Sequence, residues 1–375
     1  MRVGLDATPL LGPRTGVGGY VAGLLEGLAA RGDLDELLLV PFTWRGAGDL
    51  EAAVPAVVAG EPAVRLGRRR VPARLLQAAW AQTEWPPVEW LAGGVEVFHG
   101  TNFVAPPARR AGLVVTVHDL TYLRYPRMVS SASARYRTLV PRGLRRGAVV
   151  CTPTAAVADE VRETYRLEPE QVVVTPLGVG QEWLGAQRPD AAWLAARRLP
   201  ERYLLFVGSR EPRKNLGTLA AAYRELREQA PAAPSLVLVG PPGWGEEPDL
   251  AGLPDGAVHA PGYLGGEDLA RVVAGAAALA FPSWYEGFGL PALEALACGT
   301  PVVAANVPAL AEVLGDQAEL VDPADASALA SALAKAAEDD GGERARAARR
   351  ARAARFTWQA CAGTTLEAYS RAAAG

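Results

Sequence analysis

The feature that most constrains the fold is an alternation of short apolar runs with helical patterns, which fills both halves of the 375-residue chain. The apolar runs occupy residues 3–7, 36–42, 95–100, 112–118, 147–153, 171–178, 202–208, 235–240, 256–262, 278–283, 300–305 and 318–323. Helical periodicity fits residues 20–30, 73–83, 132–146, 155–165, 216–229, 266–274, 291–298 and 326–338. Apolar strands separated by helices are typical of parallel sheets covered on both faces. The sequence therefore predicts an α/β chain with two doubly wound, Rossmann-like domains.

The boundary between the two domains is expected within GQEWLGAQRPDAAW, residues 180–193. Typical domains hold about 100–200 residues, so a chain of this length accommodates two. We place the first domain at residues 1–185 and the second at residues 186–355. Ligands of such sheets bind beyond the carboxyl ends of the strands, so a cleft between the domains is the expected site.

Composition excludes several classes of protein. A formal net charge of −3 gives no reason to expect nucleic-acid binding. The three cysteines and three histidines lack the spacing of a disulfide framework or a metal site. The first residues lack the pattern of a signal peptide, and no apolar run approaches the ~18 residues of a membrane span. We therefore expect a cytoplasmic protein that needs no resident metal or cofactor.

The stretch FPSWYEGFGLPALEALACGTP, residues 281–301, places two acids around a glycine-rich turn. Pro291 suits the first position of a helix, and Gly299 suits its end. The backbone N–H groups around residues 287–290 (Gly287, Phe288, Gly289 and Leu290) are then expected at a helix N-terminus. Such N–H groups have no acceptor within the helix, and they attract phosphate.

The two acids, Glu286 and Glu294, fit a ligand with a diphosphate at its centre. Carboxylates repel phosphate but accept paired hydrogen bonds from vicinal hydroxyls. Glu286 is therefore expected to hold a donor sugar and Glu294 a ribose, as in a nucleotide-sugar. In the simpler interpretation, Glu286 is a loop acid and Glu294 an early-helix acid favoured by the helix dipole.

Five further segments accompany EGFGLPALE, residues 286–294. They are GVGGY (16–20), TVHDLTYLRYP (116–126), FVGSREPRKNLGTLAAAYREL (206–226), CGTPVVAANVPALAEVLGDQAELVDPAD (298–325) and FTWQACAGTTLEAY (356–369). Together they resemble the retaining glycosyltransferases of family 4, which have the GT-B fold. The resemblance implies an acceptor-binding first domain, a donor-binding second domain, and a terminal helix over residues 356–375 that crosses back to the first domain.

The resemblance also implies roles for residues that bind the donor. Lys214 matches the basic residue that binds the diphosphate. Ser209 stands where many members carry an arginine, and Arg210 follows it. Either Arg210 or Arg213 could replace that arginine. For Arg213, exposure to solvent is an equally good interpretation.

The resemblance implies that the remaining donor contacts come from backbone groups and from a glycine-rich segment. Tyr263 and Leu264 match positions whose backbone reads the base. Gly16, Gly18 and Gly19 are expected in a loop before a helix that starts near Tyr20, reaching toward the phosphates and the sugar.

The acceptor half has four candidate side chains. His118 and Asp119 follow an apolar strand, and the resemblance places His118 near the donor sugar and the reacting centre. His99 and Asn102 end another strand. For these two, an acceptor contact and a structural role are equally good interpretations.

The interpretation we adopt is a metal-independent, retaining transferase, with Glu286, His118 and Lys214 as its catalytic residues. It would move a sugar from a nucleotide-diphosphate donor to a hydroxyl of a glycan, lipid or small molecule. Within the family, the sequence most resembles mannosyltransferase-like members that use GDP-mannose. Two other classes stay open: a glycoside hydrolase that uses Glu286 and Glu294, and an isomerase or non-catalytic nucleotide-sugar binder of the same fold.

Three charged segments stand outside this site. Residues 65–85 combine arginines (Arg65, Arg68, Arg69, Arg70 and Arg74) with Leu75, Leu76 and Trp80. This pattern fits a packed surface helix, or a helix that contacts the inner face of a membrane. The arginine-rich stretch 344–355 is expected to be a solvated helix face, and Asp339 and Asp340 a surface turn.

Overall fold

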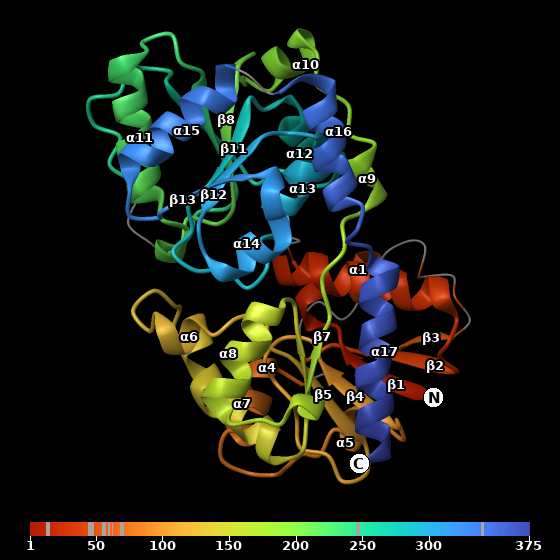
Figure 1. Cartoon of the computed structure of the whole chain (residues 1–375). Helices are drawn as coiled ribbons and strands as arrows, with labels where there is room; N and C mark the ends of the chain where they lie inside the picture. Colours follow the sequence, from red (N-terminus) through yellow and green to blue (C-terminus); the bar gives the residue numbers. More distant parts are fainter. Residues whose placement is uncertain are drawn as a thin grey trace. The chain divides into compact units, whose positions relative to one another are not determined.

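The computed structural model describes residues 1–12, 16–43, 49–54, 58, 61, 63–67, 71–244, 248–338 and 341–375. These residues form two compact units, shown as ribbons in Figure 1. Unit 1 comprises Met1–Gly178 and Phe356–Gly375, and unit 2 comprises Val179–Arg355. Each unit contains one parallel sheet with helices packed on it, which confirms the predicted fold class. Arg68, Arg69, Arg70, Asp339 and Asp340 lie outside the described residues.

Unit 1 is built on a seven-stranded parallel sheet in the order β3-β2-β1-β4-β5-β6-β7. Its strands are β1 (Arg2–Asp6), β2 (Glu36–Val40), β3 (Val64–Leu66), β4 (Val97–Gly100), β5 (Gly112–Thr116), β6 (Val149–Thr152) and β7 (Val172–Val174). Its helices include α1 (Gly16–Arg31), α2 (Asp49–Ala53), α4 (Ala73–Trp80), α5 (Glu89–Ala92), α6 (Thr121–Arg124), α7 (Tyr136–Arg145), α8 (Ala155–Tyr165) and α17 (Trp358–Ala374). The sequence did not predict β3, because this edge strand is short and largely exposed.

The terminal helix α17 completes unit 1 by packing across α1 (Figure 1). A Cβ atom added at Gly23 would lie 2.0 Å from the indole of Trp358, and one at Gly27 would lie 2.2 Å from the Trp358 carbonyl oxygen. Only glycine allows the two helices to approach this closely. Residues 356–375 are therefore an integral layer of unit 1.

Unit 2 is built on a six-stranded parallel sheet in the order β10-β9-β8-β11-β12-β13. Its strands are β8 (Tyr203–Val207), β9 (Ser235–Val239), β10 (Val258–Gly262), β11 (Ala278–Phe281), β12 (Val302–Ala305) and β13 (Glu319–Val321). Its helices include α9 (Gln181–Leu184), α10 (Ala191–Ala196), α11 (Leu216–Gln229), α12 (Gly266–Gly275), α13 (Leu290–Cys298), α14 (Pro308–Leu314), α15 (Ala326–Glu338) and α16 (Gly342–Ala353). The strand order reverses between β8 and β11, which is where open parallel sheets bind ligands.

Helix α16 is not the solvated arginine face that the sequence suggested. Arg349 donates to the Gly299 carbonyl (3.0 Å) and Arg350 to the Cys298 carbonyl (3.4 Å), both at the end of α13. Arg352 donates to the carbonyls of Val313 (2.9 Å) and Glu312 (2.5 Å), at the end of α14. These guanidinium groups satisfy carbonyls that a helix leaves without partners at its C-terminus.

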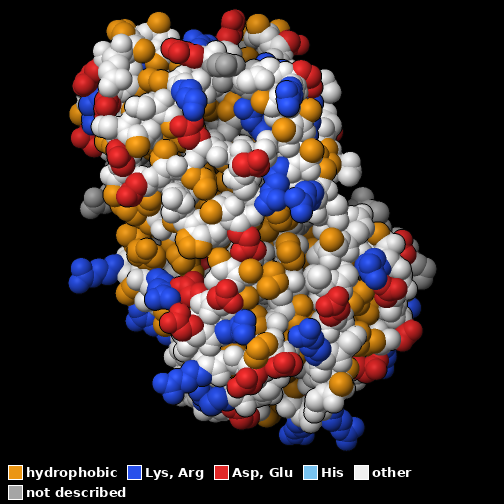
Figure 2. Space-filling view, in the orientation of Figure 1, with side chains coloured by type: hydrophobic (Ala, Val, Ile, Leu, Met, Phe, Trp, Pro, Cys, Tyr) orange, Lys and Arg blue, Asp and Glu red, His pale blue; other side chains and the backbone are white. Residues whose placement is uncertain are grey.

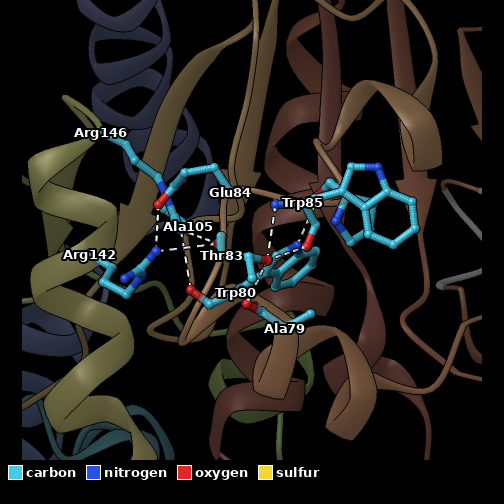
Figure 3. A network of polar contacts seen from close by, with 9 residues as sticks. Ala79, Trp80, Thr83, Glu84, Trp85, Ala105, Arg142 and Arg146 are labelled. Carbon is cyan, nitrogen blue, oxygen red and sulfur yellow. Dashed lines mark hydrogen bonds and ion pairs between the residues drawn. The ribbon is translucent and has the colours of Figure 1, made fainter.

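The end of helix α4 is held in a similar way by two arginines of α7 and its C-terminal cap (Figure 3). Arg146 donates to the carbonyls of Trp80 (3.2 Å) and Ala105 (3.0 Å). Arg142 and Arg146 both form ion pairs with Glu84, each at 2.5 Å. Leu76 and Trp80 are buried in the core of unit 1, whereas Leu75 is exposed. The apolar face of α4 is thus packed inside the unit, as a surface helix of a globular domain requires.

Acidic and basic side chains are interspersed on the face shown in Figure 2, without one continuous basic region. Among the described residues, no helix is both long and apolar enough to cross a membrane.

Candidate functional site

The candidate site of unit 2 forms where the chain leaves β8 and β11. After β8, a short 3-10 helix (Pro212–Lys214) ends at Asn215, whose φ of 58° is left-handed. The Asn215 side-chain amide donates to the carbonyls of Pro282 (3.0 Å) and Pro323 (2.7 Å). Asn215 thereby fixes the turn that carries Lys214 against the loop that follows β11.

Three charged side chains meet between these two loops. The Lys214 Nζ donates to Oε1 of Glu286 at 2.7 Å, and Arg213 Nη1 lies 2.9 Å from Oε2 of the same carboxylate. Their side chains are only 10% (Lys214), 14% (Arg213) and 8% (Glu286) exposed. Arg213 also donates to the Tyr285 carbonyl at 2.8 Å. We call Arg213, Lys214 and Glu286 the cation–carboxylate cluster.

The cluster fixes the charge of Glu286. Burial by itself raises the pKa of this carboxyl, but attraction to Arg213 and Lys214 outweighs burial and lowers the pKa to about 2. Burial and the neighbouring Arg213 lower the pKa of Lys214, whereas Glu286 raises it, and the net direction is downward. Glu286 is therefore ionised at neutral pH, and it faces two basic groups.

The placement of Arg213 corrects the sequence interpretation, in which exposure to solvent was as good an alternative as a place in the site. It is half-buried in the cluster and lies 3.8 Å from Glu211. Ser209, at the position of the family arginine, instead donates through its hydroxyl to Glu211 at 2.5 Å. The Arg210 backbone N–H donates to the Pro241 carbonyl at 3.4 Å. The adjacency of arginine and lysine in EPRKN was the one sequence signal for this second cation.

Helix α13 begins beside the cluster. Leu290 is its first residue, so Pro291 occupies the second position, one later than predicted. Gly289 has a φ of 91°, a backbone conformation that favours glycine, and a Cβ there would lie 2.3 Å from Leu310 Cδ2. Phe288 is buried. The helix ends at Cys298, and Gly299 caps it in the left-handed conformation (φ 80°) as predicted.

Glu294 lies on α13 in an environment opposite to that of Glu286. It is half-buried, and burial together with the nearby charge of Glu182 raises its pKa to about 8. At neutral pH the carboxyl is therefore largely protonated, and it can both donate and accept a hydrogen bond. Tyr263 and Leu264 follow the carboxyl end of β10. Tyr263 is exposed and Leu264 is half-buried.

In unit 1, His118 follows β5 and is half-buried between two rings. Its ring lies edge-on to Tyr20 and Phe103, with centroids 5.0 and 5.4 Å apart. The Nε2 atom donates to the Thr101 carbonyl at 2.9 Å, so Nε2 carries the hydrogen. Burial lowers the pKa of His118. The neutral ring therefore presents Nδ1 as an acceptor.

Two other candidates lie near His118. An Asp119 carboxylate oxygen accepts the Thr121 N–H at 2.8 Å, and the Asn102 amide lies 3.5 Å from the Tyr136 hydroxyl. Both side chains are half-buried.

His99 lies inside the core of unit 1. Its Nδ1 lies 2.9 Å from the Tyr369 hydroxyl and its Nε2 2.7 Å from the Thr116 hydroxyl. The ring is fully buried, and burial lowers its pKa to about 3. Of the two interpretations, the structure therefore favours the structural role, and an acceptor contact is not possible in this conformation.

The glycines of GVGGY are helical rather than part of a loop. Helix α1 begins at Gly16, so Gly16, Gly18 and Gly19 form its first turn, and the predicted start near Tyr20 was wrong. Glycine has poor intrinsic helix propensity, which led the sequence interpretation toward a loop. A Cβ at Gly18 would lie 2.8 Å from the Pro9 carbonyl oxygen, whereas Gly16 and Gly19 have open space around them.

Within the described ranges, no group of three or more His, Cys, Asp or Glu side chains is arranged to hold a metal ion.

Comparisons with known proteins cover both units of the chain. The family model "Glycosyltransferase Family 4" matches residues 14–183, and "Glycosyl transferases group 1" matches residues 201–339. The O-antigen chain mannosyltransferase B of Escherichia coli is 30% identical over 98% of this chain and 99% of its own length.

Two solved structures share the fold over nearly the whole chain. The sucrose-phosphate synthase of Thermosynechococcus elongatus has a TM-score of 0.72 at 22% identity, covering 99% of this chain and 98% of its own. Anabaena HepE in complex with UDP-glucose has a TM-score of 0.69 at 19% identity, covering 98% of each chain.

Proposed function

Because this chain belongs to the family 4 glycosyltransferases of GT-B fold, we propose that it transfers mannose, with retention of configuration, from GDP-mannose to a hydroxyl of a glycan acceptor. Membership of this family makes the chain a transferase, so the hydrolase and non-catalytic alternatives are set aside. Mannose is favoured because a relative that matches 98% of this chain is named as an O-antigen chain mannosyltransferase. Anabaena HepE, by contrast, was solved with UDP-glucose, so the base and sugar require a direct test.

The observation that carries the proposal is the cation–carboxylate cluster beside the start of α13. A diphosphate placed there meets Lys214, Arg213 and the first turn of a helix, all of which stabilise negative charge. Glu286 would then bind hydroxyls of the donor sugar. Glu294, whose carboxyl is largely protonated, would bind the ribose.

The same groups supply the chemistry of transfer. As the bond between the anomeric carbon and the phosphate oxygen breaks, negative charge grows on the diphosphate, and Lys214 and Arg213 stabilise it. The acceptor oxygen bonds to the anomeric carbon on the face that the diphosphate leaves. Its proton passes to the departing phosphate oxygen, so the mechanism needs no protein base. His118 would accept a substrate hydrogen bond through Nδ1, and no metal ion takes part.

Donor identity can be tested by thermal shift with sugar conjugates of UDP, GDP, ADP and dTDP. A ligand that binds only the folded protein raises its melting temperature by mass action. We expect GDP-mannose to give the largest shift. A larger shift with another conjugate would overturn the choice of donor, and no shift with any would overturn the proposed function.

Glu286→Gln and Lys214→Ala test the assignment of the cluster. Loss of one charge that stabilises the transition state typically lowers turnover by about 100-fold or more. Lys335→Ala is the matched control, because Lys335 is a 75%-exposed lysine that forms an ion pair with Glu319 on the surface. Wild-type turnover in either cluster variant, with the fold intact, would contradict the assignment.

A further inference from the structure

Without a ligand, the cation–carboxylate cluster is already electrically balanced by the neighbouring Glu211. Each oxygen of Glu286 is taken by one cation, Lys214 at 2.7 Å and Arg213 at 2.9 Å. Glu211 adds a second carboxylate 3.8 Å from Arg213. Two positive and two negative side chains therefore occupy the site assigned to the diphosphate.

A diphosphate must compete with Glu286 for these cations. The cluster is largely buried, so its charges interact through a medium of lower dielectric constant and are poorly screened by salt. If Lys214 and Arg213 turn toward a phosphate, the Glu286 carboxylate loses both partners. A buried carboxylate without partners is strongly unfavourable.

An intact donor and a spent nucleotide differ in how they resolve this conflict. The donor carries a sugar whose hydroxyls can donate hydrogen bonds to Glu286 as the cations turn away. A nucleoside diphosphate lacks the donor sugar, and its terminal phosphate adds negative charge near the same carboxylate. The spent nucleotide therefore leaves Glu286 unpaired and repels it.

We propose that Glu286 makes this site selective for the intact nucleotide-sugar over the nucleoside diphosphate, and so drives release of the spent nucleotide after each transfer. The inference rests on the proposed function, since it requires a nucleotide-sugar in this site. It assigns Glu286 a role in product discharge that is separate from orienting the sugar.

The test compares two dissociation constants in wild type and Glu286→Gln. Isothermal titration calorimetry is carried out without acceptor, with GDP and with GDP-mannose. If a conjugate of another base gives the largest thermal shift, the nucleoside diphosphate of that base and its sugar conjugate are used instead. We expect the variant to bind the nucleoside diphosphate about tenfold more tightly, equivalent to about 1.4 kcal/mol. The affinity for the intact donor should stay level or fall, so the ratio of the two constants moves by about tenfold or more.

Two further variants make the ratio specific to Glu286. Glu286→Asp keeps the charge and should keep the wild-type preference for intact donor. Glu211→Gln removes the other carboxylate, which lies 3.8 Å from Arg213, and should shift both affinities together and leave the ratio unchanged. A melting curve confirms that each variant is folded. If Glu286→Gln does not fold, inhibition of wild-type transfer by added nucleoside diphosphate is the test, and an inhibition constant below the dissociation constant of the intact donor would overturn the inference.

The outcomes separate the two proposals. A wild type that binds both ligands, with an unchanged ratio in Glu286→Gln, would overturn this inference and leave the proposed function standing. A wild type that binds neither ligand would overturn the proposed function, and the inference with it. Equal shifts of the ratio in Glu286→Gln and Glu211→Gln would show a general charge effect and also overturn the inference.

Discussion

At the scale of single residues, Glu286 and Glu294 show how environment decides the charge of the same side chain. Two cations hold the pKa of Glu286 at about 2 despite burial. Glu294 has a neighbouring acid, Glu182, and burial raises its pKa to about 8. One motif thus supplies a permanent anion and a carboxyl that can donate a hydrogen bond.

Arg213 and Arg210 provide a test of which arginine serves the diphosphate. Arg213→Gln removes a guanidinium that contacts Glu286 at 2.9 Å. We expect turnover to fall by about 100-fold, because a cation that stabilises the leaving group is lost. Arg210→Gln is the matched control and should lower turnover far less. Initial-rate measurements on both variants decide the matter, and a larger loss in Arg210→Gln would reverse the assignment.

Glu294 should make stability depend on pH. Its pKa rises from an ordinary 4.5 to about 8 on folding, so between these values the folded state holds a proton that the unfolded state has lost. The free energy of unfolding contributed by this group therefore falls as the pH rises from 4.5 to about 8. Glu294→Gln should flatten this decline.

Urea unfolding at several pH values across that window measures the effect. Glu267→Gln serves as the control, since Glu267 is an exposed acid in the first turn of α12. Identical slopes in wild type and Glu294→Gln would show that the carboxyl is ionised in the folded protein.

At the scale of elements, α13 is held at both ends by parts of the chain that are distant in sequence. Its start is shaped by Gly289 packed on Leu310, and its end by Arg349 and Arg350 of α16. Because α13 carries Glu294 and its first turn lies next to Glu286, these arginines support the site from the opposite end of the helix.

Removing the Arg349 contact should destabilise unit 2. Arg349→Met keeps much of the aliphatic stem but loses the hydrogen bond to the Gly299 carbonyl, a loss of about 1 kcal/mol. The free energy of unfolding from urea titration is the measurement. Arg344→Met, at an exposed position of the same helix, should have little effect. Equal losses in the two variants would mean that helix propensity, rather than capping, is responsible.

The elements differ in how well the sequence predicted them. Helices α8, α11 and α15 begin and end at the predicted residues, because their apolar faces repeat with a clear period. Strand β3 has no such pattern, and helix α14 was not predicted although Pro308 opens it. The first turn of α1 was missed because it contains three glycines, whose helix propensity is poor, and only Gly18 packs closely against another segment.

In the candidate site, too, the sequence predicted what depends on local patterns and missed what depends on contacts between distant segments. The spacing within EGFGLPALE pointed to Glu286, Glu294 and the start of α13. The pairing of Arg213 with Glu286, and the enclosure of His99 by Tyr369 and Thr116, depend on contacts between distant segments. Local patterns carry no information about such contacts, so the sequence left both questions open.

At the scale of the whole molecule, unit 2 is a continuous segment, whereas unit 1 is completed by residues 356–375. The fragment 179–355 has its own sheet and core, and we expect it to fold alone and unfold cooperatively in urea. A chain that ends at residue 355 should lose cooperative folding of unit 1, because α17 covers α1 and supplies the Tyr369 partner of His99.

Circular dichroism and urea titration of both fragments provide the measurement. A non-cooperative transition of fragment 179–355 would contradict the independence of unit 2. Cooperative, wild-type-like unfolding of unit 1 in the shortened chain would contradict the structural role of α17.

The position of α17 also sets the order of events on the ribosome. Domains usually complete folding from the N-terminus as the chain emerges. In this chain, α1 of unit 1 lacks its packing partner until α17 has been translated. Unit 2 precedes α17 in the sequence, so it is already able to fold by then. A nascent chain stalled ahead of α17 would thus carry a finished second unit and an unfinished first one.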